Sequence, residues 1–213
     1  MLTTMRIRCP DAPYRISRDS LPEFDHENVY IASAKMDGFR CIIDWDGTDV
    51  GFFSRRAPDK GGPTALPVCD ALKEEVIAWL QDNEIPALTR FDSEWIARRT
   101  EGPESLRIFG LQYYDGEWMG REREDVRFTL IENMKYNQPH VLLVEYTRSN
   151  YNDFFNQIKA KYGNLPDKQQ RAEGIVLKHI DSKLLGNIKT GKKNSQWYKI
   201  KWRDGASGHA PTF

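Results

Sequence analysis

The chain has 213 residues, enough for one generous domain or two small ones with a sizeable core. Its 31 lysines and arginines balance 31 aspartates and glutamates, so a nucleic-acid partner would have to meet a local basic patch. Charged residues make up 29% of the chain and aromatic residues 12%, a composition that excludes an intrinsically disordered protein. No apolar run approaches the ~18 residues of a membrane span, so we expect no membrane contact.

The cysteines and the N-terminus predict the cellular location of the protein. Cys9, Cys41 and Cys69 are odd in number and far apart, which fits neither a disulfide framework nor a zinc site. The first sixteen residues contain no apolar signal core. Both observations predict a reducing, cytoplasmic location.

The chain begins with a polar segment, residues 1–28, which contains three prolines and predicts an extended lead-in to the domain. Short runs rich in β-branched and aromatic residues then predict strands at residues 29–32, 40–45, 50–55, 87–97, 106–114, 141–146, 173–178 and 197–202. Apolar positions at helical spacing predict helices at residues 68–82, 122–136 and 151–162. The Gly-rich residues 203–213 predict a flexible tail.

The order of these elements predicts the fold class. Asp46-Gly47 between the second and third strands is typical of a tight hairpin turn. The strands are short and hairpin-like, and the helices are interspersed among them. We therefore predict an α+β fold with antiparallel sheets rather than a doubly wound parallel sheet.

The stretch at residues 34–40, AKMDGFR, carries the first candidate for chemistry. Lys35 follows a predicted strand, with Asp37 two residues on and Gly38 directly after. A neutral lysine is a nucleophile that can attack a phosphate, and a glycine lets the backbone approach a ligand closely. An ordinary exposed turn could have the same sequence. The choice between a nucleophilic lysine and a surface turn therefore depends on residues further along the chain.

Charged side chains recur in or beside the later strands. Period-two spacing places Lys199 and Lys201 on one face of their strand, flanked by aromatic residues, and it does the same for Asp92 and Glu94. Two carboxylates that reach one pocket could hold Mg²⁺, which takes few carboxylates together with water and substrate phosphates. Each pattern alone is also typical of an ordinary sheet surface.

Taken in order, these segments resemble the motifs of the covalent nucleotidyltransferases, the superfamily of ATP-dependent DNA ligases, RNA ligases and mRNA-capping guanylyltransferases. The segments that carry the resemblance are residues 35–40 (KMDGFR), 54–55 (SR), 92–94 (DSE), 114–115 (YD), 173–178 (EGIVLK) and 199–201 (KIK). The form Lys-x-Asp-Gly-x-Arg and the basic residues 189–201 are most similar to small phage DNA ligases. The resemblance spans residues 29–202 and implies the nucleotidyltransferase (adenylation) domain of a DNA ligase, with antiparallel sheets flanked by helices around a central ATP cleft.

The resemblance also implies roles for single residues. Lys35 would attack the α-phosphorus of ATP and form a covalent lysyl–AMP intermediate. Arg40 and Glu94 would contact the ribose, and Tyr114 would stack on adenine. Arg55 would meet a phosphate, in ligases that of the 5′ end at the nick.

Further roles concern the metal ion and the phosphates. Glu173 would place the metal, Mg²⁺ or Mn²⁺, with Glu94 and Asp37 as further metal candidates. Lys199 and Lys201 would hold the α-phosphate and offset the charge that develops in the transition state.

The sequence departs from the family pattern in three places. Ser33 stands two residues before the nucleophile, where many DNA ligases have Glu, so a hydroxyl or a backbone carbonyl would read the base. Ser93 stands where Gly is usual. Ligases of this kind usually continue into an OB-fold domain, whereas here only residues 203–213 follow Trp202, so we expect no OB-fold domain.

The resulting hypothesis is an ATP-dependent DNA ligase that seals nicked duplex DNA as a monomer, in the host cytoplasm if a phage encodes it. An accessory protein would replace the missing OB-fold domain, unless the chain is part of a longer one. An RNA ligase or an RNA-capping guanylyltransferase is the alternative within the same class. A non-catalytic nucleic-acid-binding module is the alternative of another class, and the complete set of charged motif residues argues against it.

Overall fold

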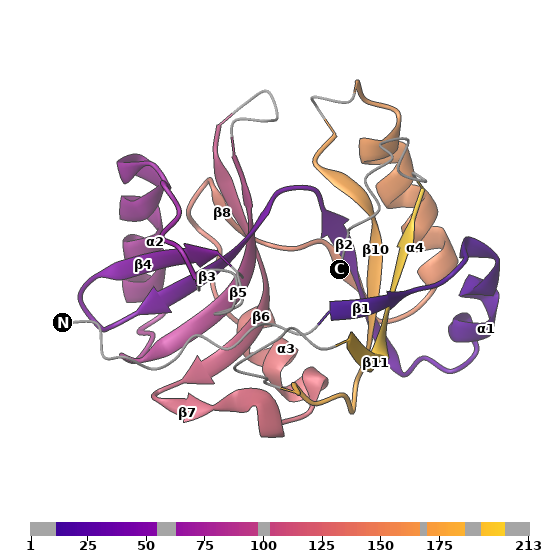
Figure 1. Cartoon of the computed structure of the whole chain (residues 1–213), viewed down its shortest axis with the longest axis horizontal. Coiled ribbons are helices and arrows are strands. Elements are labelled where there is room, and N and C mark those ends of the chain that lie inside the picture. Colours follow the sequence, from indigo (N-terminus) through magenta and orange to yellow (C-terminus); the bar gives the residue numbers. More distant parts are fainter. Residues whose placement is uncertain (1–11, 55–62, 98–102, 167–169, 186–192, 203–213) are drawn as a thin grey trace.

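The computed structural model describes residues 12–54, 63–97, 103–166, 170–185 and 193–202. These residues form two sheets that lie side by side, with helices on their outer sides (Figure 1). All strand pairs but two are antiparallel among those described, which confirms the predicted α+β class. No helix in the described part of the chain is both long and apolar enough to cross a membrane.

The first sheet has the strand order β1-β11-β10-β2-β9. Its strands are β1 (Ala12–Arg15), β2 (Tyr30–Met36), β9 (Tyr146–Thr147), β10 (Ala172–His179) and β11 (Lys193–Lys201). β1 pairs with β11 in parallel, and the other pairs are antiparallel. Helix α4 (Tyr151–Ile158) packs against β2, β9 and β10, and α1 (Leu21–Asp25) packs against α4. The lead-in thus supplies an edge strand and a helix to this half of the fold.

The second sheet has the strand order β4-β3-β5-β6-β7, with β8 also paired to β6. Its strands are β3 (Phe39–Trp45), β4 (Val50–Ser54), β5 (Thr89–Ile96), β6 (Ser105–Tyr114), β7 (Glu117–Trp118) and β8 (Val141–Leu143). Helix α2 (Asp70–Asp82) packs against β4 and β8, and α3 (Glu124–Glu132) packs against β6. The hairpin predicted at Asp46-Gly47 joins β3 to β4, and Gly47 has a φ of 101°, which a glycine adopts readily.

Each sheet has an apolar core of its own. Trp79 of α2 and Phe91 of β5 are fully buried in the core of the second sheet, with ring centroids 5.1 Å apart. Tyr151 and Phe155 of α4 and Ile175 of β10 lie in the core of the first sheet. Most apolar burial therefore lies within each half, although Ile31 of β2 joins the core of the second sheet and Ile96 of β5 joins that of the first.

Two predicted elements differ from the structure. β2 continues to Met36, so Lys35 lies within a strand and not in a turn, because β10 pairs with β2 as far as Met36 and keeps it extended. Residues 141–146 were predicted as one strand but form β8 in the second sheet and the start of β9 in the first. The Val144 amide donates to the Ile108 carbonyl, and the next carbonyl, of Glu145, accepts from the Ala34 amide. The chain crosses between the sheets at this point, which apolar patterning alone does not reveal.

Candidate active site

A cleft of about 470 Å³ opens between the two sheets. The first sheet lines it from β1, β2, β10 and β11, and the second sheet lines it from β3, β4, β5 and β6. Most of the predicted site residues border this cleft, namely Ser33, Lys35, Asp37, Arg40, Glu94, Glu173, Lys199 and Lys201. The fold thus brings together side chains that are up to 168 positions apart, from Ser33 to Lys201.

Two predicted site residues are not placed in the cleft. Arg55 lies outside the described residues. Tyr114 ends β6, pairs with Glu117 of β7 and packs against the core of the second sheet. It does not line the cleft, whereas Phe109, five residues earlier on the same strand, does.

A bulge explains why strand alternation did not single out Phe109. Asp92 of β5 pairs with Gly110, and Ser93 pairs with Ile108, so Phe109 is the extra residue on β6. A bulge of this kind re-aims a side chain and breaks the two-residue period from which faces are predicted. Gly110 could have indicated this bulge from the sequence, because a glycine inside a strand often marks a bulge.

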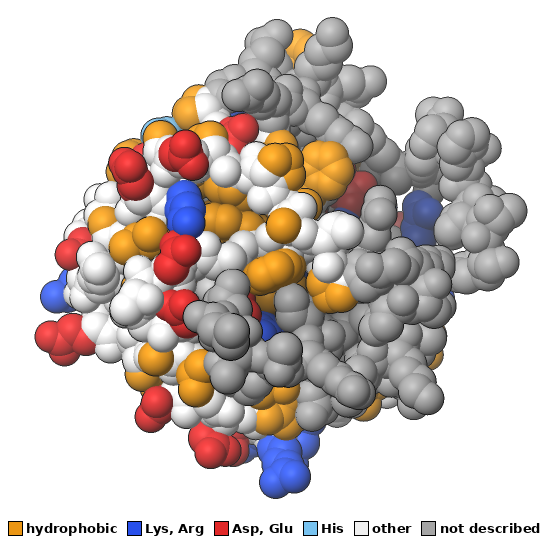
Figure 2. Space-filling view, turned by 60° about the vertical axis from the view of Figure 1, so that its left-hand side comes forward, with side chains coloured by type: hydrophobic (Ala, Val, Ile, Leu, Met, Phe, Trp, Pro, Cys, Tyr) orange, Lys and Arg blue, Asp and Glu red, His pale blue; other side chains and the backbone are white. Residues whose placement is uncertain are grey.

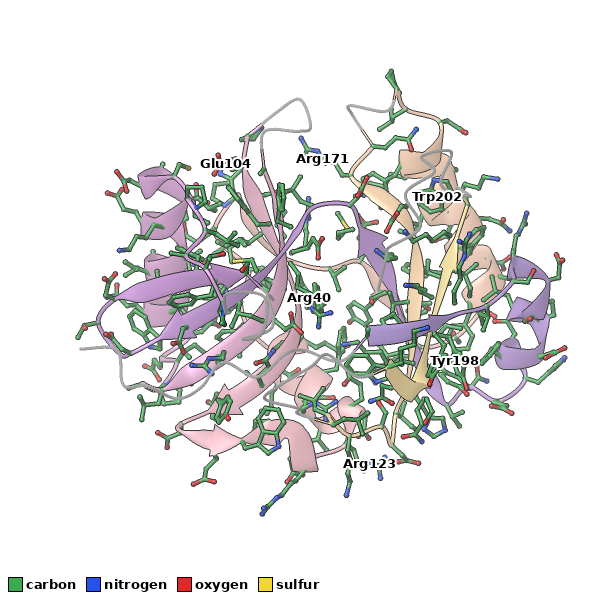
Figure 3. The ribbon with its side chains drawn as sticks, viewed as in Figure 1. Arg40, Glu104, Arg123, Arg171, Tyr198 and Trp202 are labelled. Atoms are coloured by element: carbon green, nitrogen blue, oxygen red, sulfur yellow. The ribbon has the colours of Figure 1, made fainter. Side chains whose placement is uncertain are left out.

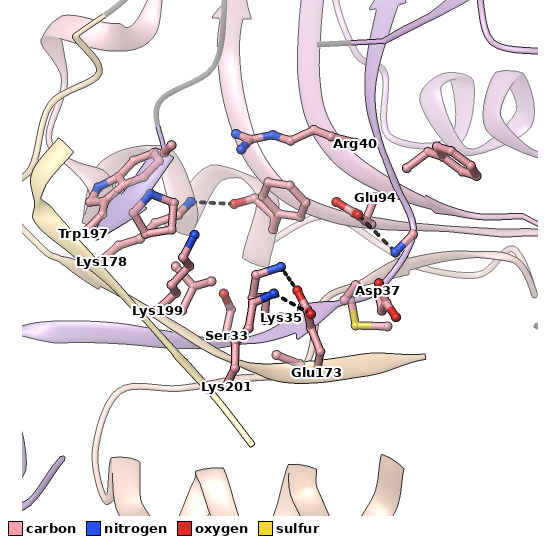
Figure 4. A pocket seen from close by; sticks show the side chains of 18 of the residues that line it. Ser33, Lys35, Asp37, Arg40, Glu94, Glu173, Lys178, Trp197, Lys199 and Lys201 are labelled. Carbon is pink, nitrogen blue, oxygen red and sulfur yellow. Dashed lines mark hydrogen bonds and ion pairs between the residues drawn. The ribbon is translucent and has the colours of Figure 1, made fainter. Parts of the chain in front are cut away.

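Glu173 joins two lysines at the centre of the cleft. Its Oε1 contacts Lys35 Nζ, and its Oε2 accepts from Lys201 Nζ at 2.6 Å (Figure 4). Burial raises the pKa of the Glu173 carboxyl, but the charges and hydrogen bonds of the two lysines outweigh it and hold the pKa below its ordinary value. Glu173 is therefore ionised at neutral pH and fixes both lysines.

The close approach of β10 and β11 makes this contact possible. Glu173 is the bulged residue between Ala172, which pairs with Met36, and Gly174, which pairs with Lys35. A Cβ added to Gly174 would lie 1.9 Å from the Ile200 carbonyl oxygen, so a side chain has no room there. The glycine lets the two backbones meet, and the bulge turns Glu173 toward the lysines.

Lys199 adds a third ammonium to the same wall. It lies on the same face of β11 as Lys201, two residues away. Burial lowers the pKa of Lys199, and the charges of Lys35 and Lys201 lower it further. Because these like charges repel one another, an anion such as a phosphate in the cleft would be stabilised by all three.

The opposite wall carries Arg40 and two carboxylates. Arg40 points into the space between the sheets (Figure 3), and Asp92 accepts from its Nε at 2.7 Å and also from its Nη2. The guanidinium carbon lies 5.2 Å from the centroid of the Phe109 ring. Glu94 accepts a hydrogen bond from the Gly38 amide at 3.1 Å. The bidentate pair holds Arg40 in one orientation before any ligand binds.

The predicted metal candidates border the cleft without forming a cluster. Asp37 is exposed at the turn after β2, Glu94 lies on the opposite wall, and Glu173 is bound to the lysines. Among the described residues, no three carboxylate, imidazole or thiol groups gather as a metal site. Such a set suits an ion that takes one or two carboxylates and is otherwise bound by water and substrate phosphates, as Mg²⁺ is.

Burial of Glu94 predicts a pH effect on stability. Burial raises the pKa of Glu94 from 4.5 to about 7, against the opposing charges of Lys35 and Arg40. Between pH 4.5 and about pH 7, Glu94 is protonated in the folded protein but ionised in the unfolded chain. The free energy of unfolding should therefore fall as pH rises, by up to about 1.4 kcal/mol per pH unit from this group.

Glu94→Gln should remove the contribution of this group to the fall of the unfolding free energy with pH. Urea denaturation at pH 5, 6 and 7 would measure that fall. Glu117→Gln is the matched control, because Glu117 is exposed on β7. Equal slopes in wild type and Glu94→Gln would show that Glu94 does not titrate in this range.

Comparisons with known proteins agree with the fold. The model of the ATP dependent DNA ligase domain family matches residues 17–201. No curated protein sequence matches the chain. Among solved structures, the chain is similar to "mycobacterial DNA ligase D complexed with ATP and MES", with a TM-score of 0.63 and 18% identity over 92% of this chain and 60% of that one.

Two smaller ligases are also similar. The ATP-dependent DNA ligase from bacteriophage T7, in complex with ATP, has a TM-score of 0.57 and 15% identity over 94% of this chain and 69% of that one. A Lig E DNA ligase has a TM-score of 0.53 and 15% identity over 92% of this chain and 69% of that one. At these identities the likeness shows the fold, and the chain spans only 60% of the length of the DNA ligase D structure. The family model, in contrast, covers nearly all of the chain, which therefore belongs to the ATP-dependent DNA ligase domain family.

Proposed function

We propose that the chain is the catalytic domain of an ATP-dependent DNA ligase that seals nicks through a lysyl–AMP intermediate. The observation that carries the proposal is the placement of Lys35. Its Nζ contacts Glu173 in a cleft that also contains Lys199 and Lys201, in a chain of the DNA ligase domain family. These are a nucleophile, a proton acceptor and two cations for a phosphate.

The first step would join AMP to the protein. The lone pair of a neutral Lys35 amine attacks the α-phosphorus of ATP, the bond from that phosphorus to the bridging oxygen breaks, and pyrophosphate leaves with the electron pair. The proton that Nζ loses has an acceptor in contact, the Glu173 carboxylate. Lys199 and Lys201 would stabilise the charge on the α-phosphate oxygens.

The remaining steps would act on DNA. AMP passes from Lys35 to the 5′-phosphate at the nick, and the 3′-hydroxyl then attacks that phosphate and releases AMP. Arg40 and Glu94 would contact the ribose from the opposite wall, where Asp92 holds Arg40 in place. Phe109 offers a flat ring on the cleft surface and replaces Tyr114 as our candidate to stack on adenine.

A divalent cation, Mg²⁺ or Mn²⁺, would be held by Glu173, with Asp37 or Glu94, together with the phosphates of the nucleotide. When bound, it would offset negative charge on the phosphates. The three candidate ligands are all carboxylates, which can bind either Mg²⁺ or Mn²⁺.

The charge distribution supports contact with nucleic acid at the cleft. The face in Figure 2 has carboxylates and some lysine or arginine side chains spread among apolar and uncharged side chains over its described part. The net charge of the chain is zero, whereas Lys35, Arg40, Lys199 and Lys201 converge on the cleft. We therefore propose nicked duplex DNA as the partner, bound across the cleft opening by a cytoplasmic monomer or with a partner protein that helps to grip it.

A nick-sealing assay tests the proposal. The protein with ATP and Mg²⁺ should join a nicked duplex that has a 5′-phosphate and a 3′-hydroxyl, and it should not join one without the 5′-phosphate. Preference for a nicked RNA duplex would favour the RNA-ligase alternative, and labelling with GTP instead of ATP would favour a capping enzyme. Absence of any nucleotide adduct would leave the non-catalytic module.

A further inference from the structure

Arg107 is a half-buried arginine of β6 without a hydrogen-bond partner in the described part of the chain. Its Nε is fully enclosed and has no acceptor, and its two terminal nitrogens also have no described acceptor but are not enclosed. By contrast, the buried or half-buried Arg40, Arg90 and Arg127 each contact a carboxylate. A polar group that is buried without a partner destabilises the fold, so Arg107 calls for an explanation.

The Glu145 carboxylate does not serve as that partner. Its charge acts on Arg107, but its Oε1 accepts a hydrogen bond from Lys161 Nζ at 2.9 Å and another from the Tyr162 hydroxyl. Among the described residues, the ion pair of Glu145 is with Lys161 and not with Arg107. The terminal nitrogens of Arg107 therefore keep their capacity to donate to an anion from outside the protein.

A second arginine approaches from the other half of the fold. Arg171 directly precedes β10 of the first sheet, whereas Arg107 belongs to the second sheet. Figure 3 shows Arg171 in the space between the two halves. Burial lowers the pKa of Arg107, and the charge of Arg171 lowers it further, against the opposing effects of Tyr162 and Glu145. Two positive charges that approach each other across this seam favour an anion between them.

The two arginines lie next to the cleft but do not line it. The Arg171 carbonyl accepts a hydrogen bond from the Asp37 amide at 2.9 Å, and Asp37 borders the cleft two residues after Lys35. An anion held by Arg107 and Arg171 would thus be separated from the nucleophile by the turn that joins β2 to β3. A polyanion that crosses the cleft could contact both places at once.

The chemistry of a guanidinium group suits a backbone phosphate. The group is planar, always charged, and presents parallel N–H donors that match two oxygens of a phosphate. A DNA strand carries one such anion per nucleotide, so a strand whose end lies in the cleft presents further phosphates beside it. Contacts of this kind fix the position of a duplex without reading its sequence.

We propose that Arg107 and Arg171 together bind one backbone phosphate of the DNA, beside the strand end that the cleft receives. The proposal rests on the proposed function, since it assigns a second contact to the same DNA. The phosphate gives the terminal nitrogens of Arg107 an acceptor and offsets the repulsion between the two arginines. Because the arginines belong to different sheets, the bound phosphate bridges both halves of the fold.

Affinity for a nicked duplex tests the proposal, measured by fluorescence anisotropy without ATP or Mg²⁺. Arg107→Gln and Arg171→Gln should each weaken binding about tenfold at low salt, the cost of a lost charged hydrogen bond. Each should also reduce the salt dependence by about one phosphate contact. Arg107→Lys should restore part of the affinity, because it keeps the charge and loses the paired donors.

Replacing the backbone phosphates one at a time with uncharged methylphosphonates locates the contact. The wild-type affinity should fall about tenfold at one position near the nick, and this fall should vanish when both arginines are changed to glutamine. Arg123→Gln is the matched control, because Arg123 pairs with Asp125 and lies at the opposite end of the molecule from Arg171 (Figure 3). It should keep the wild-type affinity and the same sensitive position.

Arg107→Met separates binding from a structural role. It removes an unpaired buried group, so the folded protein should resist urea at least as well as the wild type while it still loses affinity for DNA. Arg171→Gln keeps the test open if Arg107→Met does not fold. Lower resistance to urea with unchanged DNA affinity would make Arg107 a structural residue and overturn the proposal.

ATP binding distinguishes the DNA backbone from the phosphates of the nucleotide. In a Lys35→Ala background, calorimetry should give ATP affinities within about twofold for all these variants. An equal loss for ATP and DNA would assign the arginines to the triphosphate and overturn the DNA contact, as would a wild-type protein that binds no nicked duplex. Absence of an AMP adduct, with DNA binding that still depends on Arg107, would overturn the lysyl–AMP mechanism and support this site.

Discussion

Lys35→Ala should abolish the AMP adduct that we expect the wild-type protein to form with ATP and Mg²⁺. Lys201 still contacts Glu173, but in our proposal it binds a phosphate and does not attack it, so we expect adduct formation to fall by at least about 10³-fold. Intact mass spectrometry after incubation with ATP measures the adduct directly. Lys35→Arg should fail equally, because a guanidinium keeps the charge and the ion pair but does not become a neutral nucleophile.

Lys73→Ala is the matched control for this experiment. Lys73 also pairs with a carboxylate, Asp49, but on the surface and away from the cleft. It should leave the adduct unchanged. An adduct that persists in Lys35→Ala would assign the nucleophile to another residue and overturn the lysyl–AMP mechanism at this position.

Gly174→Ala should damage both stability and activity. The added Cβ would lie 1.9 Å from the Ile200 carbonyl oxygen, and backbone atoms of a central strand pair have little freedom to move. We expect the free energy of unfolding to fall by about 3 kcal/mol. Because β10 and β11 would shift apart where Glu173 meets Lys201, adduct formation should fall by about 10²-fold in the folded fraction.

Gly163→Ala provides the comparison. A Cβ there would meet the flexible Lys159 side chain at 3.1 Å and the edge of the Trp202 ring at 3.3 Å but no backbone atom, and Gly163 lies outside the two strands. It should change the free energy of unfolding by less than about 1 kcal/mol. Chemical denaturation and adduct mass spectrometry on both variants make the comparison. Wild-type behaviour of Gly174→Ala would mean that the strand approach does not position Glu173.

Parts of the site could be predicted from the sequence because they depend on local spacing. The two-residue period of a strand is enough to place Lys199 and Lys201 on one face, and the turn signal at Asp46-Gly47 is enough to predict the hairpin that follows Arg40. The resemblance of the ordered motifs to the nucleotidyltransferases implied that these residues share a cleft. Glu173 was predicted as a site residue on this basis and lines the cleft.

Other parts depend on register and on tertiary partners. The bulge that turns Phe109 into the cleft exists only in the pairing of β5 with β6, and the pairing of Arg40 with Asp92 needs both strands in place. The sequence placed Lys178 at the end of a predicted strand but did not reveal its ion pair. Its partner Glu124 lies 54 positions earlier, on a helix. No pattern within one segment reveals a contact of this kind.

The crossing from β8 to β9 limits how the cleft can open. Within two residues, the Val144 amide is bonded to the second sheet at Ile108, and the Glu145 carbonyl is bonded to the first sheet at Ala34. Ile108 precedes Phe109, and Ala34 precedes Lys35. One stretch of backbone therefore sets the separation between the proposed adenine platform and the nucleophile. Because backbone hydrogen bonds join both sheets here, we expect any opening of the cleft to be a rotation about this crossing, which would keep the proposed nucleophile and the proposed adenine platform at a constant separation.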